Sequence, residues 1–198
     1  ATDELPGHHE PSAQWRKDGR FRVFGVGRLS RYKGFGTLIR AVAGVDEVQL
    51  IIAGDGDQRS RLERFVPDHA RGRVRLVGGV DDATRNRLMS ECDLFCLPSI
   101  SRAEAFGLSL VEAMAAGKAQ LATRVAGSGM DWVVEEGRTG WMVDSGDIDA
   151  LAHLLRRLAR ERGMVVIAGE QSRERFETRF RIDAVAREIV GVYEALAR

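Results

Sequence analysis

Residues 21–36, which read FRVFGVGRLSRYKGFG, decide the fold. The first six residues form an apolar, β-rich run, and a glycine-rich segment with cationic side chains follows directly. A run that is almost continuously apolar is typical of a strand buried on both faces of a parallel sheet. In such sheets ligands bind beyond the carboxyl ends of the strands. The stretch therefore predicts a first strand that ends in a functional loop.

The rest of the chain repeats this alternation of short apolar runs and longer helical patterns. Strands are predicted at residues 21–26, 48–53, 74–77, 94–97, 119–122 and 141–143. Helices are predicted between them at residues 37–45, 57–69, 81–90, 108–116 and 130–136. Beyond Asp147, a predicted N-cap, only helical patterns occur, at residues 148–162, 171–177 and 182–196. The sequence predicts an α/β fold, a Rossmann-like doubly wound parallel sheet of about six strands with a C-terminal helical extension.

Composition is that of an ordinary globular protein. The 198 residues allow one domain or a small pair, and the 44% of hydrophobic residues can form a proper core. The net charge of +1 gives no reason to expect a nucleic-acid partner, which usually requires a clear basic excess. Residues 1–20, which include Pro6 and Pro11, are predicted to be a linker or N-terminal extension, and residues 21–198 the folded domain.

The sequence shows no pattern of a membrane span, a signal peptide or a zinc site. No apolar run approaches the roughly 20 residues that span a bilayer, and the first residues do not have the order of a signal peptide. We therefore expect a cytoplasmic protein. Cys92 and Cys96 are expected to be buried apolar side chains, because no second Cys or His pair stands at zinc-ligand spacing.

The loop after the first predicted strand begins like a dinucleotide-binding fingerprint but departs from it. Ser30 occupies the third glycine position, and cationic residues follow before any helix begins. It is not a P-loop, because no Gly-Lys-Ser/Thr follows at the required spacing. Arg28 and Lys33 on this flexible backbone suit a diphosphate, although two solvated surface cations would explain the loop alone equally well.

Two glutamates flank the turn that precedes the helix at residues 108–116. Glu104 and Glu112 lie eight positions apart, so on one helix they would be separated by about 80° and about 12 Å. We expect them to bind different parts of one extended ligand, since a carboxylate accepts hydrogen bonds from vicinal sugar hydroxyls. The free N–H groups near Phe106, Gly107 and Leu108 would bind phosphate oxygens between them. The alternative is that neither glutamate binds a ligand, with Glu112 on the exposed face of a helix and Glu104 in a surface loop.

These segments resemble the C-terminal, donor-binding domain of the retaining glycosyltransferases of GT-B fold, glycosyltransferase family 4. The matching segments keep the order and spacing of that family, and they are GRLSRYKG at 27–34, IAGDG at 52–56, EAFGL at 104–108, EAMAAG at 112–117 and TG at 139–140. The Glu-x7-Glu pattern is the hallmark of the family. The resemblance runs from about residue 21 to the end of the chain. Ala119 and Gln120 depart from the usual Pro-Val, at a strand start rather than at a site.

The resemblance implies a role for each candidate site residue. In the loop that contains Gly27, Arg28 and Lys33 would bind the donor diphosphate. Glu104, the candidate catalytic residue, would contact the transferred sugar and could orient or stabilise it, and no nucleophilic role is assigned to it. Glu112 would bind the ribose hydroxyls. Three further positions, Phe106, Gly107 and Leu108, would contribute backbone amides to the sugar and the distal phosphate. The loop at residues 78–80, which ends at Val80, would hold the base.

The resemblance also implies an activity and a missing partner. The chain would bind a nucleoside-diphosphate sugar, from which the whole enzyme transfers a hexose to an acceptor in surface polysaccharide or glycolipid synthesis. The acceptor site would lie on an N-terminal domain that this chain lacks, so the chain alone should bind donor without transferring sugar. The full-length enzyme could attach peripherally to the inner face of a membrane. A stand-alone nucleotide-binding regulatory module and a sugar-nucleotide epimerase of GT-B architecture remain as alternatives.

No metal and no cofactor are expected. By the resemblance, Arg28, Lys33 and the helix terminus supply the positive potential that a departing diphosphate requires. No Asp-x-Asp stands beside the phosphate loops. Asp55 and Asp57 come nearest to that motif, but they are more simply explained as a turn and a helix cap.

Overall fold

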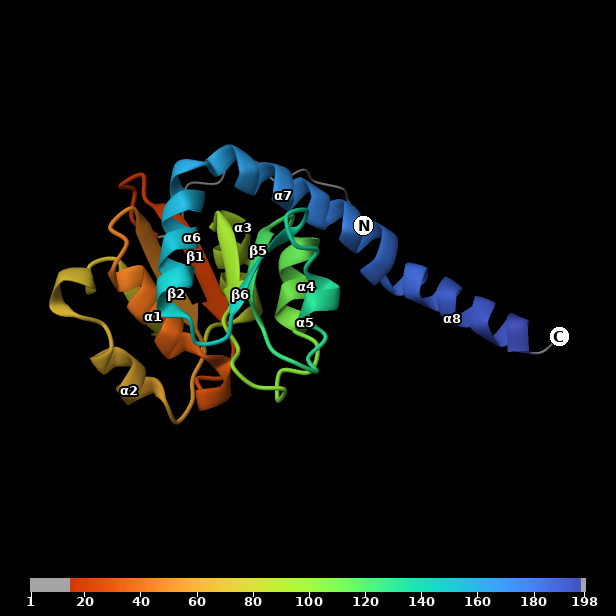
Figure 1. Cartoon of the computed structure of the whole chain (residues 1–198), viewed down its shortest axis with the longest axis horizontal. Coiled ribbons are helices and arrows are strands. Elements are labelled where there is room, and N and C mark those ends of the chain that lie inside the picture. The colour runs from red at the N-terminus through yellow and green to blue at the C-terminus, as the bar shows by residue number, and fades with distance from the viewer. Residues whose placement is uncertain (1–14, 197–198) are drawn as a thin grey trace.

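A six-stranded parallel sheet forms the centre of the domain in this computed structural model, which describes residues 15–196 (Figure 1). The strands are β1 (Phe21–Val26), β2 (Val48–Ala53), β3 (Val74–Gly78), β4 (Leu94–Leu97), β5 (Ala119–Arg124) and β6 (Gly140–Asp144). They are ordered β3-β2-β1-β4-β5-β6, so the direction of winding reverses between β1 and β4. The loops after β1 and β4 therefore diverge at the switch point at which open α/β sheets bind ligands.

Helices cover both faces of this sheet, as predicted. In β1, Phe21 and Val23 belong to the apolar cluster on one face, whereas Phe24 belongs to the cluster on the other. The first cluster includes side chains of α1 (Phe35–Ala43), α6 (Ile148–Arg160) and α7 (Arg162–Arg175). The second includes side chains of α3 (Asp82–Glu91), α4 (Leu108–Ala115) and α5 (Met130–Val133). Because side chains alternate between faces, a doubly covered strand is apolar at nearly every position.

Two predicted helices are much shorter in the structure. The helix predicted at residues 57–69 is α2 (Arg59–Arg64), followed by a 3-10 turn at Asp68–Ala70. Pro67 lies between them, and proline both lacks an N–H donor and disfavours the helical conformation in the preceding residue. Asp57 does not cap this helix, since the N-cap residue is Gln58. The helix predicted at residues 130–136 ends at Val133, the last residue of α5.

The C-terminal region is helical as predicted, but one helix begins much earlier. Asp147 caps α6, and its carboxylate accepts a hydrogen bond from the Ala150 N–H at 2.8 Å. The helix predicted from residue 171 is the end of α7, which already begins at Arg162. Gly163 and Gly169 weaken the local helical signal of this segment, and the burial of Val165 on the sheet compensates for it.

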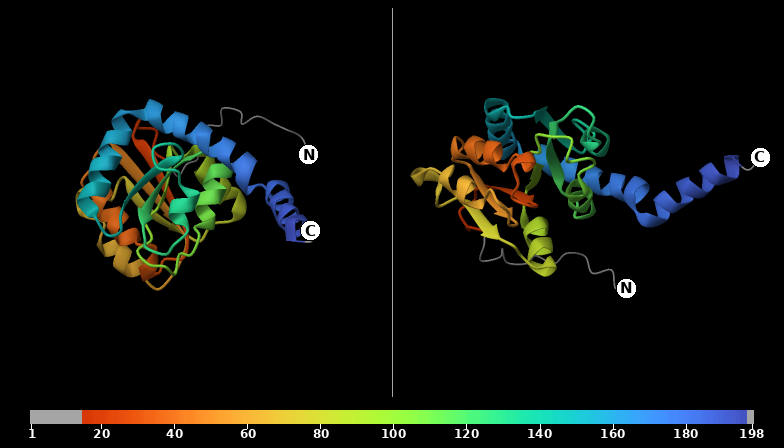
Figure 2. Two further views of the ribbon diagram at one scale, coloured as in Figure 1. Left: turned by 45° about the vertical axis from the view of Figure 1, so that its right-hand side comes forward. Right: turned by 90° about the horizontal axis from the view of Figure 1, so that it is seen from below.

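After α7 a π-helical turn, Phe176–Phe180, leads into α8 (Ile182–Leu196). Figures 1 and 2 show α8 projecting away from the body of the domain, and Ala184 is its one buried residue. None of the helices formed by residues 15–196 combines the length and the hydropathy that a bilayer-spanning segment requires.

The N-terminal end of the described chain packs on the domain. Trp15 is buried, and the backbone N–H of Arg16 donates to the side-chain oxygen of Gln49 at 3.0 Å. Gln49 in turn donates to the Arg16 carbonyl oxygen at 3.2 Å. Residues 1–14 of the predicted linker or extension, like residues 197–198, lie outside the described range.

Candidate functional site

The loops after β1 and β4 are packed against each other through a glycine. Gly34 has a φ of +68°, and a Cβ at this position would lie 1.9 Å from the carbonyl oxygen of Pro98. Next to this contact, the Ile100 N–H donates to the Tyr32 carbonyl oxygen at 2.7 Å. A side chain at residue 34 would force the two loops apart, so the glycine allows the close approach. Lys33 is thereby held beside the segment that follows β4.

Lys33 and Glu104 form an ion pair that is largely enclosed by protein. The Lys33 Nζ lies 2.5 Å from Oε2 of Glu104, and the two side chains are 11% and 12% exposed. The Ser99 hydroxyl donates to the same carboxylate oxygen at 3.3 Å. Removing two charges from water is costly, and folding rarely requires it. The pair is therefore a candidate for binding or chemistry, and it joins two residues that the sequence predicted for different parts of one ligand.

The ion pair opens onto a cavity of about 430 Å³ at the carboxyl edge of the sheet. Seven of the nine predicted site residues line it, namely Gly27, Lys33, Glu104, Phe106, Gly107, Leu108 and Glu112. Arg28 is exposed and does not line the cavity, and Val80 is likewise absent from its wall. The structure thus brings Lys33 and both glutamates to one hollow, at the start of α4.

Two polar residues of this cavity were missed by the sequence analysis. Arg85 reaches it from the first half of α3, and its guanidinium lies 3.2 Å from the carboxylate of Asp82. Ser109 lines it in the first turn of α4, and its hydroxyl is one of four buried side-chain polar atoms in residues 15–196 that have no hydrogen-bond partner. A helical pattern does not reveal which face of α3 meets the loops of other strands, so nothing in the sequence singled out Arg85.

The loops after β2 and β3 are joined by Asp55. Its carboxylate accepts hydrogen bonds from the Gly79 N–H at 2.6 Å and from the Arg59 guanidinium at 2.8 Å. These two donors hold the pKa of Asp55 below its ordinary value. Asp55 therefore holds two loops together, including the loop predicted to bind a base. In residues 15–196, no three His, Cys, Asp or Glu side chains are grouped as metal ligands.

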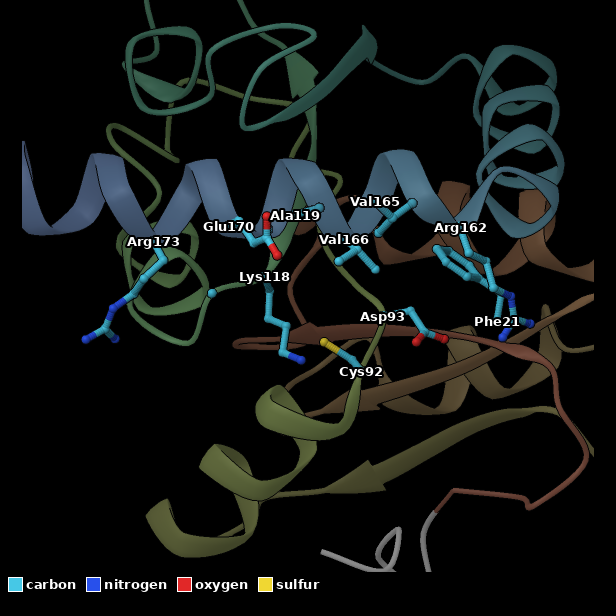
Figure 3. Close-up of a pocket in the computed structure, with 12 residues that line it drawn as sticks. Phe21, Cys92, Asp93, Lys118, Ala119, Arg162, Val165, Val166, Glu170 and Arg173 are labelled. Carbon is cyan, nitrogen blue, oxygen red and sulfur yellow. The ribbon is translucent and has the colours of Figure 1, made fainter. Parts of the chain in front are cut away.

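A second cavity, of about 600 Å³, lies at the opposite edge of the sheet, beneath α7 (Figure 3). Its wall is largely apolar and includes Phe21, Val165 and Val166, with Lys118 extending toward Cys92. Burial raises the pKa of the Cys92 thiol to about 12, so this thiol stays protonated at neutral pH. Cys92 and Cys96 are both buried free cysteines, which confirms the prediction for them. None of the predicted site residues lines this cavity.

The site residues and their order along the chain agree with one protein family. The family model for glycosyl transferases group 1 matches residues 9–179. The chain belongs to this family. Its solved neighbours share the fold, including Anabaena HepE in complex with UDP and glucose, which is 25% identical with a TM-score of 0.78. That match covers 89% of this chain and 49% of the HepE chain. Membership confirms the resemblance to a GT-B glycosyltransferase domain that the motifs indicated.

Two curated relatives are named as sugar transferases. The phosphatidyl-myo-inositol mannosyltransferase of Mycobacterium leprae (strain TN) is 38% identical over 186 residues, 85% of this chain and 46% of that protein. The lipopolysaccharide core biosynthesis glycosyltransferase LpsE of Rhizobium meliloti (strain 1021) is 33% identical over 162 residues, 77% of this chain and 46% of that protein. The chain spans about half the length of these relatives.

Proposed function

We propose that this chain is the donor-binding domain of a retaining glycosyltransferase that moves a hexose from a nucleoside-diphosphate sugar to an acceptor, in surface polysaccharide or glycolipid synthesis. The observation that carries the proposal is the enclosed Lys33–Glu104 ion pair, which shares one cavity with Glu112 at the switch point of the sheet. The UDP complex of HepE and the names of the curated relatives support this choice of ligand and product class.

The charges around the cavity suit the departure of a nucleoside diphosphate. As the bond to the sugar breaks, negative charge grows on the diphosphate, and fixed positive groups lower the barrier most effectively when they are already in place. Lys33 and Arg85 line the cavity, Arg28 follows Gly27 in the same loop, and α4 directs its N-terminal dipole there. These groups supply the required positive potential, so the proposal includes no metal ion and no cofactor.

The ion pair itself suggests how the donor is received. The charges of Lys33 and Glu104 neutralise each other in the ion pair. We propose that a phosphate oxygen of the donor replaces the carboxylate at the Lys33 ammonium, which frees Glu104 to accept hydrogen bonds from hydroxyls of the transferred sugar. Glu112 would bind the ribose, and the loop from Gly78 to Val80 would hold the base, mostly through its main chain.

The remaining parts of the reaction belong to the whole enzyme. The acceptor would bind to an N-terminal domain that is not part of this chain, and transfer would take place between the two domains. This chain alone is therefore expected to bind the donor without transferring sugar. The whole enzyme is proposed to work in the cytoplasm, with peripheral attachment to the inner face of a membrane.

Calorimetric titration with UDP, GDP and ADP and with their hexose conjugates tests the proposal. Glu112→Ala should weaken the binding of both the bare nucleotide and its conjugate. Glu104→Ala should weaken the binding of the hexose conjugate more than that of the bare nucleotide. Because this substitution also frees Lys33, the decisive quantity is the ratio of the affinity for the conjugate to the affinity for the nucleotide. Failure of the unmodified chain to bind any compound in the panel would contradict the proposal. Equal affinity for nucleotide and conjugate, unchanged by Glu104→Ala, would favour the regulatory module instead.

A further inference from the structure

Three aromatic rings from distant parts of the chain meet behind the candidate donor site. Phe106 belongs to the turn before α4, Trp132 to α5, and Phe180 ends the π-helical turn after α7. The ring centroids are separated by 5.8 Å for Phe106 and Trp132, 6.3 Å for Phe106 and Phe180, and 5.1 Å for Trp132 and Phe180. These distances and the tilted or edge-on orientations are those of favourable aromatic pairs.

Arg175 fixes this aromatic cluster from the side of α7. Its guanidinium carbon lies 5.8 Å from the centroid of Trp132 and 5.5 Å from that of Phe180. The guanidinium also donates to the Trp132 carbonyl oxygen at 2.7 Å and pairs with the carboxylate of Glu135. The Arg175 side chain is as enclosed as that of Lys33. One arginine thus joins the end of α7 to α5 through two rings and a backbone carbonyl.

Phe106 connects the aromatic cluster to the site. It lines the cavity between Glu104 and Gly107, and the carbonyl oxygen of the preceding Ala105 accepts a hydrogen bond from the Gly129 N–H at 2.7 Å. Residues 98–107 form neither helix nor strand, so no regular ladder of hydrogen bonds fixes their conformation. The ring contacts of Phe106 therefore help to fix this segment, together with the ion pair of Glu104 with Lys33. The segment carries a site carboxylate and leads into the start of α4.

We propose that Trp132, Arg175 and Phe180 are positioning residues for the donor site, although they do not line its cavity. They hold the turn at residues 105–107, and with it Glu104 and the first amides of α4, in the arrangement that receives the sugar and the distal phosphate. The proposal rests on the proposed function for its ligand. The aromatic contacts themselves do not depend on which ligand binds.

Phe180→Ala removes the ring that joins the α7 end to Phe106. We expect the affinity for the nucleotide sugar to fall by about 10-fold to 100-fold, because small displacements of binding groups have effects of this size. Phe180→Tyr, which keeps the ring, should restore the affinity to within about 3-fold of the unmodified chain. Tyr193→Ala is the matched control, since Tyr193 is 70% exposed on α8 and should not change binding. Trp132→Phe supplies a milder variant if Phe180→Ala does not fold.

Hydrogen exchange without ligand separates this inference from the proposed function. In Phe180→Ala the amides of residues 104–109 should exchange faster, whereas those of β5 should keep the protection that they have in the unmodified chain. If the unmodified chain binds no nucleotide sugar, the proposed function fails, and the exchange result alone then decides whether the aromatic cluster positions the turn. Unchanged exchange at residues 104–109, or equal acceleration throughout the domain, would overturn the inference.

Discussion

The two edges of the sheet each carry a cavity with a lysine, and they differ in what surrounds it. At the amino edge, beneath α7, the larger cavity of about 600 Å³ has a mostly apolar wall, and Lys118 extends toward a buried thiol (Figure 3). At the carboxyl edge, the cavity of about 430 Å³ contains Lys33 in an enclosed ion pair with Glu104. Size alone would therefore select the edge at which none of the predicted site residues lies.

The difference follows from how parallel strands are connected. At the carboxyl edge, the loops after β1 and β4 leave in opposite directions, so their polar groups face the gap between them. At the amino edge, α7 crosses the starts of the strands and packs closely, with Gly169 against the carbonyl oxygen of Gly117. Charged side chains therefore line an open cavity at the carboxyl edge, whereas apolar surface is buried beneath α7 at the amino edge. Matched substitutions at the two edges can test this distinction.

The largest expected effect concerns the glycine that joins the two site loops. Gly34→Ala should lower the free energy of unfolding by about 3 kcal/mol or more, because its Cβ would overlap the Pro98 carbonyl oxygen in addition to the strain of the positive φ. Gly137, before β6, has a φ of +75° but nothing within 4 Å of a Cβ. Gly137→Ala should therefore cost only the conformational strain, about 1–2 kcal/mol. Equal losses in urea denaturation would contradict the role given to the loop contact.

The next largest effect is a loss of nucleotide affinity that distinguishes the two cavity lysines. Lys33→Ala should weaken nucleoside-diphosphate binding by about 10-fold to 100-fold, the range expected when a charge-assisted hydrogen bond is lost. Lys118→Ala should leave the affinity within about twofold, since its cavity lies at the far edge of the sheet. Arg28→Ala should also weaken binding, but less than Lys33→Ala, because the Arg28 side chain is exposed. Calorimetry at one fixed ionic strength measures all three, and a large loss in Lys118→Ala would reverse the assignment of the edges.

A smaller effect is expected in the pH dependence of stability, which tests whether the amino-edge cavity is apolar around Cys92. Burial raises the pKa of the Cys92 thiol to about 12 in the folded chain, above its ordinary value of 9.0. Between these values the folded state holds a proton that the unfolded state has lost, so the contribution of Cys92 to stability decreases as pH rises. At pH 10 the decrease should be about 1 kcal/mol relative to pH 7, and Cys92→Ala should remove it. An identical pH slope in both proteins would show that the pKa of this thiol is not raised in the folded state.

Much of the fold and of the carboxyl-edge site could be predicted from the sequence, whereas the amino-edge cavity could not. Apolar strands buried on both faces define the sheet. The motif segments at residues 27–34 and 104–107 lie on loops whose place follows from parallel topology, and Glu112 lies on the helix that follows the second loop. The sequence could not show that Gly34 rests on Pro98, the contact that holds Lys33 beside the segment after β4. Nor could it show that Arg28 in the same loop stays exposed. Nor could it pair Phe106 with Phe180, because that contact depends on where α7 ends after crossing the sheet.

Arg85, which only the structure revealed, carries the smallest expected effect. Arg85→Ala should weaken diphosphate binding about 3-fold to 5-fold, because its side chain is one-third exposed and already paired with Asp82. Arg87→Ala is the control, since Arg87 is exposed on the same helix and does not line the cavity. Raising the salt concentration distinguishes a contact from a general field effect, because screening removes long-range attraction first. If Arg85→Ala loses about as much diphosphate affinity at roughly 0.5 M salt as at low salt, the guanidinium contacts the ligand directly. A loss that disappears, or one that Arg87→Ala reproduces, would leave Lys33 as the cavity's contact for the diphosphate.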